Sequence, residues 1–214
     1  MMDLIDFILH VDRHLLGLIG QYGLWVYGIL FLIVFVETGL VVMPFLPGDS
    51  LLFAAGTLAG VGSLDPLALG GGLFVAAALG DSCNYYVGSR IGAAVYARDS
   101  RWIRRDHLDR ARAFFERHGG KSVLIARFAP FLRTFVPFVA GASRMPYARF
   151  LMFNILGALF WVGGFVGLGY FFGNLPGVKA HFTWVLLGII VLSLLPALVA
   201  YLQGRRPAAG GVPR

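Results

Sequence analysis

Long apolar stretches dominate the pattern of hydrophobic and polar positions in this chain. A membrane-spanning helix needs about 20 predominantly apolar residues, and four stretches reach that length, at 23–43, 66–96, 146–173 and 181–201. Residues 3–20 differ, because polar and apolar side chains recur there with the period of a helix. The pattern predicts an N-terminal amphipathic helix on the membrane surface and four transmembrane helices.

Two further apolar segments, at 44–60 and 125–141, are interrupted by proline and glycine. Proline removes a backbone donor and clashes with the preceding turn, so a helix is expected to break there. The expected breaks are at Pro44, Pro47, Gly48, Pro130 and Pro137. Each segment is too short or too interrupted to cross, so we predict two re-entrant helical hairpins. Such backbone is tolerated at membrane depth only where protein or a water-filled cavity surrounds it.

The two interrupted segments begin halves of the chain that resemble each other. Both contain the triplet Pro-Phe-Leu and end in Ala-Gly, and in each half the following span has an aromatic run closed by a glycine, Gly88 or Gly173. We therefore predict an inverted repeat, with repeat one at about 44–88 and repeat two at about 130–173. In transporters of this kind the site lies near the membrane midplane, where the broken helices meet.

Composition also indicates a polytopic membrane protein of the all-α class, because 58% of the 214 residues are hydrophobic and only 14% are charged. The net charge of +7 does not indicate nucleic acid, since most basic residues lie in the linker 97–121 and in the tail. The positive-inside rule places both in the cytoplasm, so four spans leave both termini cytoplasmic. We expect one membrane domain over residues 1–203 and a disordered tail over 204–214.

The basic linker carries an apolar stripe at helical spacing. The stripe consists of Leu108, Ala111, Phe114 and Phe115. We expect this segment to lie on the membrane surface, where each basic residue near anionic lipid contributes roughly 1 kcal/mol.

Four charged side chains lie in or beside apolar segments: Glu37, Asp49, Arg127 and Arg133. On insertion scales each costs roughly 2.5–3.5 kcal/mol at the bilayer centre when unpaired. One interpretation is a set of structural salt bridges between the two halves. The other is an anion site formed by the arginines, with acids that titrate, because the planar guanidinium donates two parallel hydrogen bonds to a phosphate. Placement on broken hairpins favours the site, since structural pairs need no broken helix.

Weaker candidates lie in the second span. Asp81 is interpreted as a partner behind the site or as a proton relay, and Asn84 as a polar contact between helices or a lesser site residue. Trp161 is interpreted, with the other tryptophans, as part of interface belts and packing. The single cysteine, Cys83, is expected to be buried and excludes an internal disulfide. No metal or cofactor is expected, and phosphate-loop, HExxH, GxSxG and CxxC motifs are absent from the sequence, so we do not expect an enzyme.

Three long stretches resemble the DedA family of bacterial inner-membrane proteins. They read FVETGLVVMPFLPGDSLLFAAGTLAG, GDSCNYYVGSRIG and FFERHGGKSVLIARFAPFLRTFVPFVAGASRM. The resemblance covers nearly the whole chain and implies the paired re-entrant hairpins that this family shares with eukaryotic VTT-domain proteins. It implies that Glu37 and Asp49 are the important membrane acids and that Arg127 and Arg133 are the important arginines. It also implies an inner-membrane location and the movement of polyprenyl phosphate or other phospholipids between leaflets.

The leading hypothesis is therefore a membrane translocase that returns a lipid phosphate, undecaprenyl phosphate, to the cytoplasmic leaflet. Arg127 and Arg133 would bind the phosphate, while Glu37 and Asp49 would carry a coupling proton or release the headgroup. One alternative is a proton-coupled exporter of small ions or cationic drugs, and another is a non-transporting scaffold for envelope assembly. The expected partners are membrane lipids, polyprenyl phosphate and, where transport is coupled, protons. An oligomer is compatible with the sequence.

Overall fold

The computed structural model describes residues 23–40, 48–97, 105–180 and 188, and within these ranges every regular element is a helix, as the sequence predicts. The helices are α3 (Leu24–Gly39), α4 (Gly48–Gly60), α5 (Pro66–Ala97), α6 (Arg105–His118), α7 (Lys121–Ala126), α8 (Pro130–Ala142), α9 (Tyr147–Gly173) and α10 (Pro176–Ala180). The predicted amphipathic helix at 3–20 and the predicted tail lie outside the described residues, as does the predicted span at 181–201 apart from residue 188.

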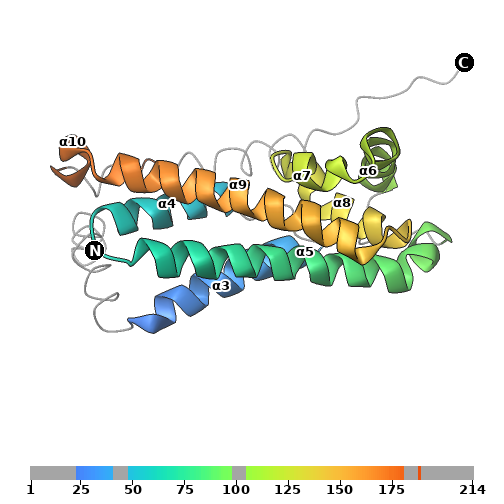
Figure 1. Ribbon diagram of the computed structural model, residues 1–214, viewed down its shortest axis with the longest axis horizontal. Coiled ribbons are helices and arrows are strands. Elements are labelled where there is room, and N and C mark those ends of the chain that lie inside the picture. Colours follow the sequence, from blue (N-terminus) through green and yellow to red (C-terminus); the bar gives the residue numbers. More distant parts are fainter. Residues whose placement is uncertain (1–22, 41–47, 98–104, 181–187, 189–214) are drawn as a thin grey trace, which may run out of the picture.

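Two long helices, α5 and α9, run side by side in opposite directions through the length of the molecule (Figure 1). Each contains a stretch of 27 residues, about 40 Å of helix, that is long and apolar enough to cross a membrane. They match two of the four predicted spans. Helix α3 has 16 residues and covers only part of the predicted span at 23–43, whose last residues lie outside the described ranges. The number of four spans and the re-entrant path of the hairpins remain predictions.

The two short helices α4 and α8 begin where the sequence predicts a break. Helix α4 starts at Gly48, while Pro44 and Pro47 lie outside the described residues. Helix α8 starts at Pro130, directly after Ala129, whose backbone is extended. Proline is favoured at the first position of a helix, because its missing N–H has no partner there in any case. The chain therefore turns at 127–129, between α7 and α8, with Arg127 buried and Phe128 exposed.

The prediction of a break at Pro137 is wrong. Pro137 lies inside α8, which continues to Ala142. A proline within a helix leaves the carbonyl four residues earlier without its usual donor, and in membrane helices neighbouring groups can compensate for this loss. The residues on either side of it, Val136 and Phe138, are fully buried. Packing on both sides thus holds α8 together through the proline.

Each short helix packs against a long helix of the other predicted repeat, α4 along the end of α9 and α8 along the end of α5 (Figure 1). The backbones touch at glycines. The carbonyl group of Phe53 lies against Gly169, and that of Phe138 lies against Gly88, so that a Cβ on either glycine would clash with backbone atoms. Small residues allow this close approach of membrane helices. The inverted repeat remains a prediction. It would explain why α4 packs on α9 in the same way as α8 packs on α5.

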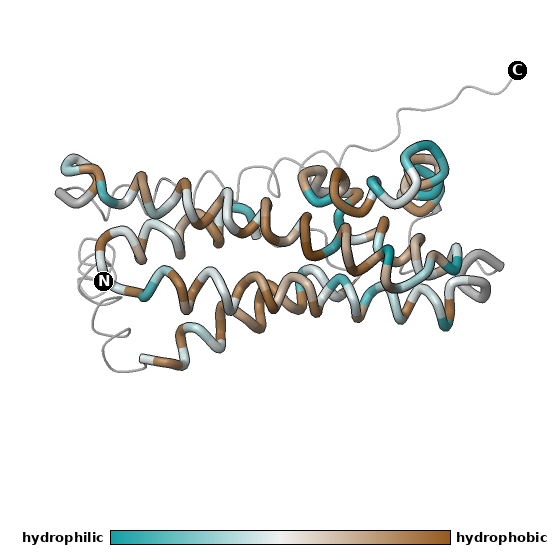
Figure 2. The backbone as a smooth tube through the Cα atoms, viewed as in Figure 1, coloured by the Kyte–Doolittle hydropathy of each residue, from teal (hydrophilic) through white to brown (hydrophobic). Residues whose placement is uncertain are grey.

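Helix α6 uses its apolar stripe for contacts within the protein. Leu108 and Ala111 are buried in a cluster with residues of α8, and Phe114 and Phe115 pack against the same cluster. This apolar face is therefore covered by protein, and the position of the segment on the membrane surface remains a prediction. Most other residues of α6 are hydrophilic (Figure 2), and the helix carries an exposed ion pair between Arg112 and Glu116 at 2.9 Å.

Large apolar side chains are exposed along the outer faces of the long helices, as expected where helices face lipid. On α5 and α9 they include Leu67, Val75, Leu79, Met152, Leu159, Phe160, Leu168 and Phe171. Cys83 is also exposed on α5, so the expectation that it is buried is wrong. The polar positions Asp81 and Asn84 on either side of it are buried. The inner face of α5 is therefore the polar one in this region.

Candidate functional site

Three carboxylates and two guanidinium groups meet in the interior of the helix bundle. They belong to Glu37 of α3, Asp49 of α4, Asp81 of α5, Arg127 between α7 and α8, and Arg133 of α8. The fold thus brings together the four charged residues that the sequence singled out and adds Asp81 to them. The two arginines form separate clusters, which differ in their partners and in their exposure.

Both predicted acids bind Arg133. Its Nη1 donates a hydrogen bond to Asp49 Oδ1 at 2.7 Å, and its Nη2 forms an ion pair with Glu37 Oε1. The guanidinium of α8 therefore links two helices of the first half of the chain. The Glu37 side chain is 1% exposed, whereas the Asp49 side chain is 42% exposed. Asp49 is consequently the partner of Arg133 that a molecule from outside the bundle can reach.

Local structure places the two acids at the beginning of α4. Asp49 lies in the first turn of this helix. The Glu37 carboxylate lies directly against Gly48, the first residue of α4, where a Cβ would collide with it. The N-terminus of a helix favours negative charge, because its first N–H groups have no partners within the helix. Gly48 therefore allows the buried carboxylate of α3 to approach the beginning of α4.

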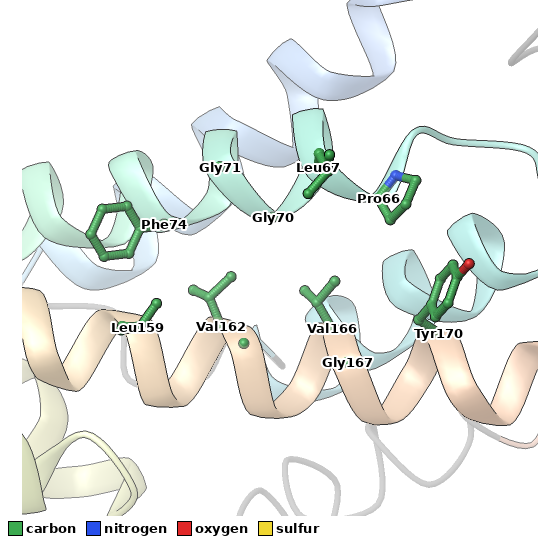
Figure 3. Close-up of a pocket in the computed structure, with 11 residues that line it drawn as sticks. Pro66, Leu67, Gly70, Gly71, Phe74, Leu159, Val162, Val166, Gly167 and Tyr170 are labelled. Carbon is green, nitrogen blue, oxygen red and sulfur yellow. The ribbon is translucent and has the colours of Figure 1, made fainter.

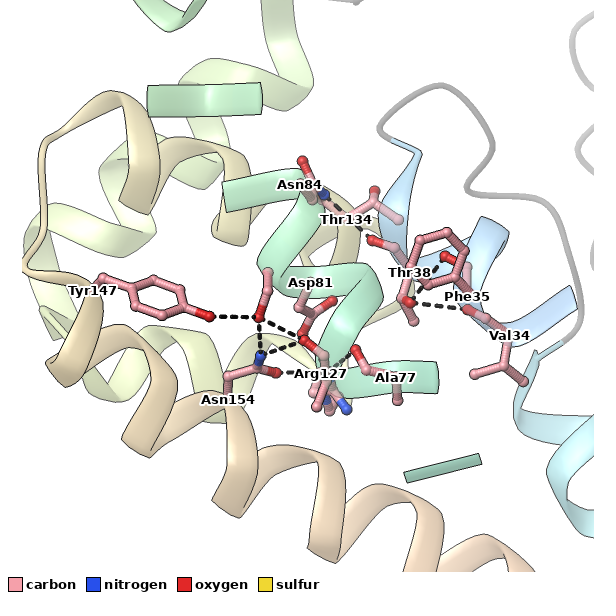
Figure 4. A network of polar contacts seen from close by, with 12 residues as sticks. Val34, Phe35, Thr38, Ala77, Asp81, Asn84, Arg127, Thr134, Tyr147 and Asn154 are labelled. Carbon is pink, nitrogen blue, oxygen red and sulfur yellow. Dashed lines mark hydrogen bonds and ion pairs between the residues drawn. The ribbon is translucent and has the colours of Figure 1, made fainter. Parts of the chain in front are cut away.

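Arg127 is held by a different and fully buried set of groups (Figure 4). Its Nη2 forms an ion pair with Asp81 Oδ2 and donates to Asn154 Oδ1 at 3.1 Å and to the Ala77 carbonyl at 3.2 Å. Asp81 is thus the direct partner of Arg127, which the sequence could not assign. The Nε and Nη1 atoms of Arg127 have no acceptor among the described residues.

Asn84 lies in the same polar region but serves contacts between helices. Its side-chain amide donates to the Thr134 carbonyl of α8 at 2.6 Å and lies 3.4 Å from the Thr38 carbonyl of α3 (Figure 4). The residue therefore ties α5 to α3 and α8. This geometry matches the packing interpretation of Asn84.

Trp161 is one of two residues of α9 at the site that sequence reasoning missed, the other being Asn154. It is fully buried, and its indole Nε1 donates to Asp49 Oδ1 at 2.8 Å. The guanidinium carbons of Arg133 and Arg127 lie 4.8 and 5.5 Å from the centre of its ring, within the range of cation–π interactions. Trp161 therefore contacts both arginine clusters. Its interpretation as a packing residue is confirmed by its place in the buried core, whereas the interpretation as an interface residue is wrong.

Two signals in the sequence could have indicated this role. Trp161 lies in the middle of the span Tyr147–Gly173, whereas interface tryptophans lie at the ends of spans. Asn154 is an isolated amide within the same apolar span and lies about two turns before Trp161, on the same face. One face of α9 thus contacts both arginines, Asn154 binding Arg127 and Trp161 lying against both.

The charges of the site determine what it can bind. Three carboxylates against two guanidiniums leave one formal negative charge, so an anion cannot simply be added. It must replace a carboxylate or enter together with protons. Among the residues that the structure describes, no group of three or more His, Cys, Asp and Glu side chains could hold a metal ion. Exchange of anionic groups on arginine is the chemistry that this arrangement can perform.

An apolar pocket of about 450 Å³ lies between the first half of α5 and the second half of α9 (Figure 3). Its lining consists of Pro66, Leu67, Gly70, Gly71, Phe74, Leu159, Val162, Gly163, Val166, Gly167 and Tyr170. Val162 directly follows Trp161 in α9, so the pocket begins beside the helix turn that carries the site tryptophan. Its lining suits a hydrocarbon chain.

Comparison with known proteins identifies the family. Residues 46–171 match the VTT domain. The chain is 48% identical to Protein DedA of Escherichia coli (strain K12) over 96% of this chain and 95% of the relative. It is 46% identical to an uncharacterized membrane protein of Mycobacterium leprae (81% and 78% covered) and 35% identical to the inner membrane protein YghB of Escherichia coli (88% and 84% covered). No solved structure matches the chain. The chain therefore belongs to the VTT-domain family of membrane proteins that includes DedA, as the resemblance in its sequence implied.

Proposed function

We propose that this protein is a translocase that moves a lipid phosphate between the leaflets of the bacterial inner membrane, with undecaprenyl phosphate as its cargo. The observation that carries the proposal is the ion pair between Arg133 Nη1 and Asp49 Oδ1, in which the arginine is buried and the acid is partly exposed. Arginine suits a phosphate because its planar fork donates two parallel hydrogen bonds. In this structure the protein's own carboxylates occupy that fork.

Binding of the headgroup then proceeds by exchange. The phosphate replaces Asp49 on Arg133, and Glu37, which is buried, stays in place. The three carboxylates and two guanidiniums of the site together carry one formal negative charge. Entry of a phosphate is therefore favoured when Glu37 or Asp49 takes up a proton. Release follows when the carboxylate loses its proton and pairs with the arginine again. This exchange couples the movement of the lipid to protons through Glu37 and Asp49.

Arg127 provides the second positive charge beside the bound headgroup. Its ion pair with Asp81 remains closed, and its Nε and Nη1 atoms are free of acceptors among the described residues. The apolar pocket between α5 and α9 supports a lipid as cargo, because it offers a hydrocarbon chain a place beside the turn of Trp161 and Val162. A small ion would make no use of it.

The test is transport in liposomes that contain the purified full-length protein and a labelled polyprenyl monophosphate, with no solute gradient applied. The expected result is movement of label between leaflets, lost in Arg133→Lys and kept in Arg112→Lys. Arg112 is a matched control because it is an exposed arginine on α6 and pairs with Glu116 of the same helix. Proton-coupled flux of a solute without lipid movement would instead support the exporter, and neither activity would support the scaffold.

The proposed orientation has both termini in the cytoplasm. It is tested in a Cys83→Ser background with single cysteines at Gly62, in the turn between α4 and α5, and at Arg117, at the end of α6. A membrane-impermeant thiol reagent applied to whole spheroplasts should label the first and not the second. Labelling of both positions from outside would contradict the orientation.

A further inference from the structure

One oxygen atom in the site accepts two hydrogen bonds from buried donors. Asp49 Oδ1 lies 2.7 Å from Arg133 Nη1 and 2.8 Å from Trp161 Nε1. Both distances are typical of charge-assisted hydrogen bonds to an anionic oxygen. The indole nitrogen can only donate, so it must find an acceptor within the protein or in a bound molecule.

The two donors and the acceptor differ in their freedom to move. The Trp161 side chain is fully buried, and the guanidinium carbons of Arg133 and Arg127 lie within 5.5 Å of the centre of its ring. The Asp49 side chain is 42% exposed and can rotate away from the bundle. When it does, the buried indole N–H is left without a partner, which is costly unless another acceptor takes its place. A non-bridging oxygen of a phosphate monoester is such an acceptor.

We infer that Trp161 is a ligand-binding residue of the anion site, where its indole N–H and Arg133 Nη1 together bind one non-bridging oxygen of a phosphate monoester in the position of Asp49 Oδ1. The inference rests on the proposed function and names a donor that neither the family relationship nor the charged residues supply. The Asp49 oxygen marks the place of the ligand oxygen. The indole ring lies against both guanidiniums, and this contact fixes the direction of its N–H.

A simpler role for Trp161 would be to hold Asp49 in place. The two roles predict opposite effects of Trp161→Phe, which keeps an aromatic ring but removes the N–H. If Trp161 only holds Asp49, the substitution releases Arg133, and a phosphate binds as well as before or more tightly. If Trp161 binds the ligand, the phosphate binds more weakly, because a donor to an anionic oxygen is lost.

The experiment is calorimetric titration of the purified full-length protein in detergent with a short-chain prenyl monophosphate. We expect Kd to rise about tenfold in Trp161→Phe, as for the loss of one hydrogen bond to a charged group. The rise should persist when Asp49→Ala is compared with Asp49→Ala/Trp161→Phe, because no carboxylate remains there to be held. Trp25→Phe is the matched control, since Trp25 is 72% exposed on α3, and it should bind as the wild type does.

A second measurement uses the unaltered protein. The chain has four tryptophans, so ¹⁵N-labelled indoles give four N–H signals, and the Trp161 signal is the one that disappears in Trp161→Phe or remains unaccounted for after substitution of the other three. This signal should move on addition of the prenyl monophosphate and not of the corresponding prenyl alcohol. A similar movement with inorganic phosphate would support the donor role and identify free phosphate, rather than a lipid headgroup, as sufficient for the site.

The outcomes separate the two proposals. If the wild type binds neither the prenyl monophosphate nor inorganic phosphate, the proposed function fails and the role of Trp161 fails with it. If the wild type binds but Trp161→Phe binds equally or more tightly, only the role of Trp161 is overturned. The same holds if the effect of Trp161→Phe vanishes in the Asp49→Ala background, or if the Trp161 signal does not respond to ligand.

Discussion

Arg127 and Arg133 lie against the same tryptophan ring, yet their surroundings have little else in common. Arg127 is surrounded by Asp81, Asn154 and a backbone carbonyl, all of them buried. Arg133 is held by one buried acid, Glu37, and by one partly exposed acid, Asp49. An ion pair with no exposed member fixes the structure, whereas a pair with an exposed member can exchange its partner. The difference separates an arginine whose ion pair stays closed from one that can release its partner to a ligand.

The largest effect is expected from breaking the closed cluster. Asp81→Asn keeps the shape of the side chain but leaves the buried charge of Arg127 without its counter-ion, which typically costs about 3–5 kcal/mol of unfolding free energy. Asp49→Asn removes an acid that is partly exposed, so its cost should be about 1 kcal/mol. Denaturant unfolding in detergent micelles measures both. Equal losses in the two variants would contradict the distinction between the clusters.

A second test replaces each arginine by lysine, which keeps the charge but loses the planar fork. We expect Arg133→Lys to reduce binding of a prenyl monophosphate about tenfold or more, while the free energy of unfolding changes little. Arg127→Lys should instead lower the stability by about 1–3 kcal/mol, because the Ala77 carbonyl and the Asn154 oxygen lose their buried donor. If Arg133→Lys transports lipid as the wild type does, the fork is not required and the phosphate site is contradicted.

A third test addresses the buried acid of the open cluster. Glu37→Gln keeps the size of the side chain and removes its charge and its ability to exchange a proton. If Glu37 takes part in coupling, lipid transport by the variant should lose its dependence on pH, measured in liposomes across a series of buffers. Asp65→Asn is a control, because Asp65 is exposed and caps α5 by accepting a hydrogen bond from the Ala68 N–H. An active Glu37→Gln variant with the wild-type pH dependence would remove Glu37 from the coupling role.

A fourth test, with the smallest expected effect, compares how accessible the two partners of Arg133 are to a reagent in water. In a Cys83→Ser background, cysteine at position 49 should react with a water-soluble thiol reagent much faster than cysteine at position 37, because the native side chains are 42% and 1% exposed. Mass spectrometry of the labelled protein gives both rates. Similar rates at the two positions would show that Asp49 is no more accessible than Glu37.

The sequence predicted which charges matter better than it predicted how they pair. Glu37, Asp49, Arg127 and Arg133 were recognisable because isolated charges in apolar segments need an explanation. Their pairing depends on which helices become neighbours and on how α7 and α8 meet at the turn before Pro130, and neither follows from spacing along the chain. The sequence therefore leaves Asp81 as a partner behind the site or as a proton relay, and only the structure shows it to be the direct partner of Arg127.

Uncharged residues were harder to recognise, since an apolar span can contain a tryptophan for many reasons. Trp161 has most of the character of a core residue, and only its N–H, directed at Asp49, gives it another role. Pro137 was misjudged for a related reason. The effect of a proline depends on the packing around it, and the buried neighbours of Pro137 hold α8 together.

Cys83 is the single cysteine of the chain and lies exposed on α5, two residues from the buried Asp81. The protein therefore carries its own attachment point for a spin label, on the helix that holds the counter-ion of Arg127. One added cysteine at the exposed Phe160 of α9 completes a pair for pulsed electron paramagnetic resonance, with no native cysteine to remove. The distance between the two long helices can thus be followed in a lipid bilayer, before and after a phosphate lipid is supplied.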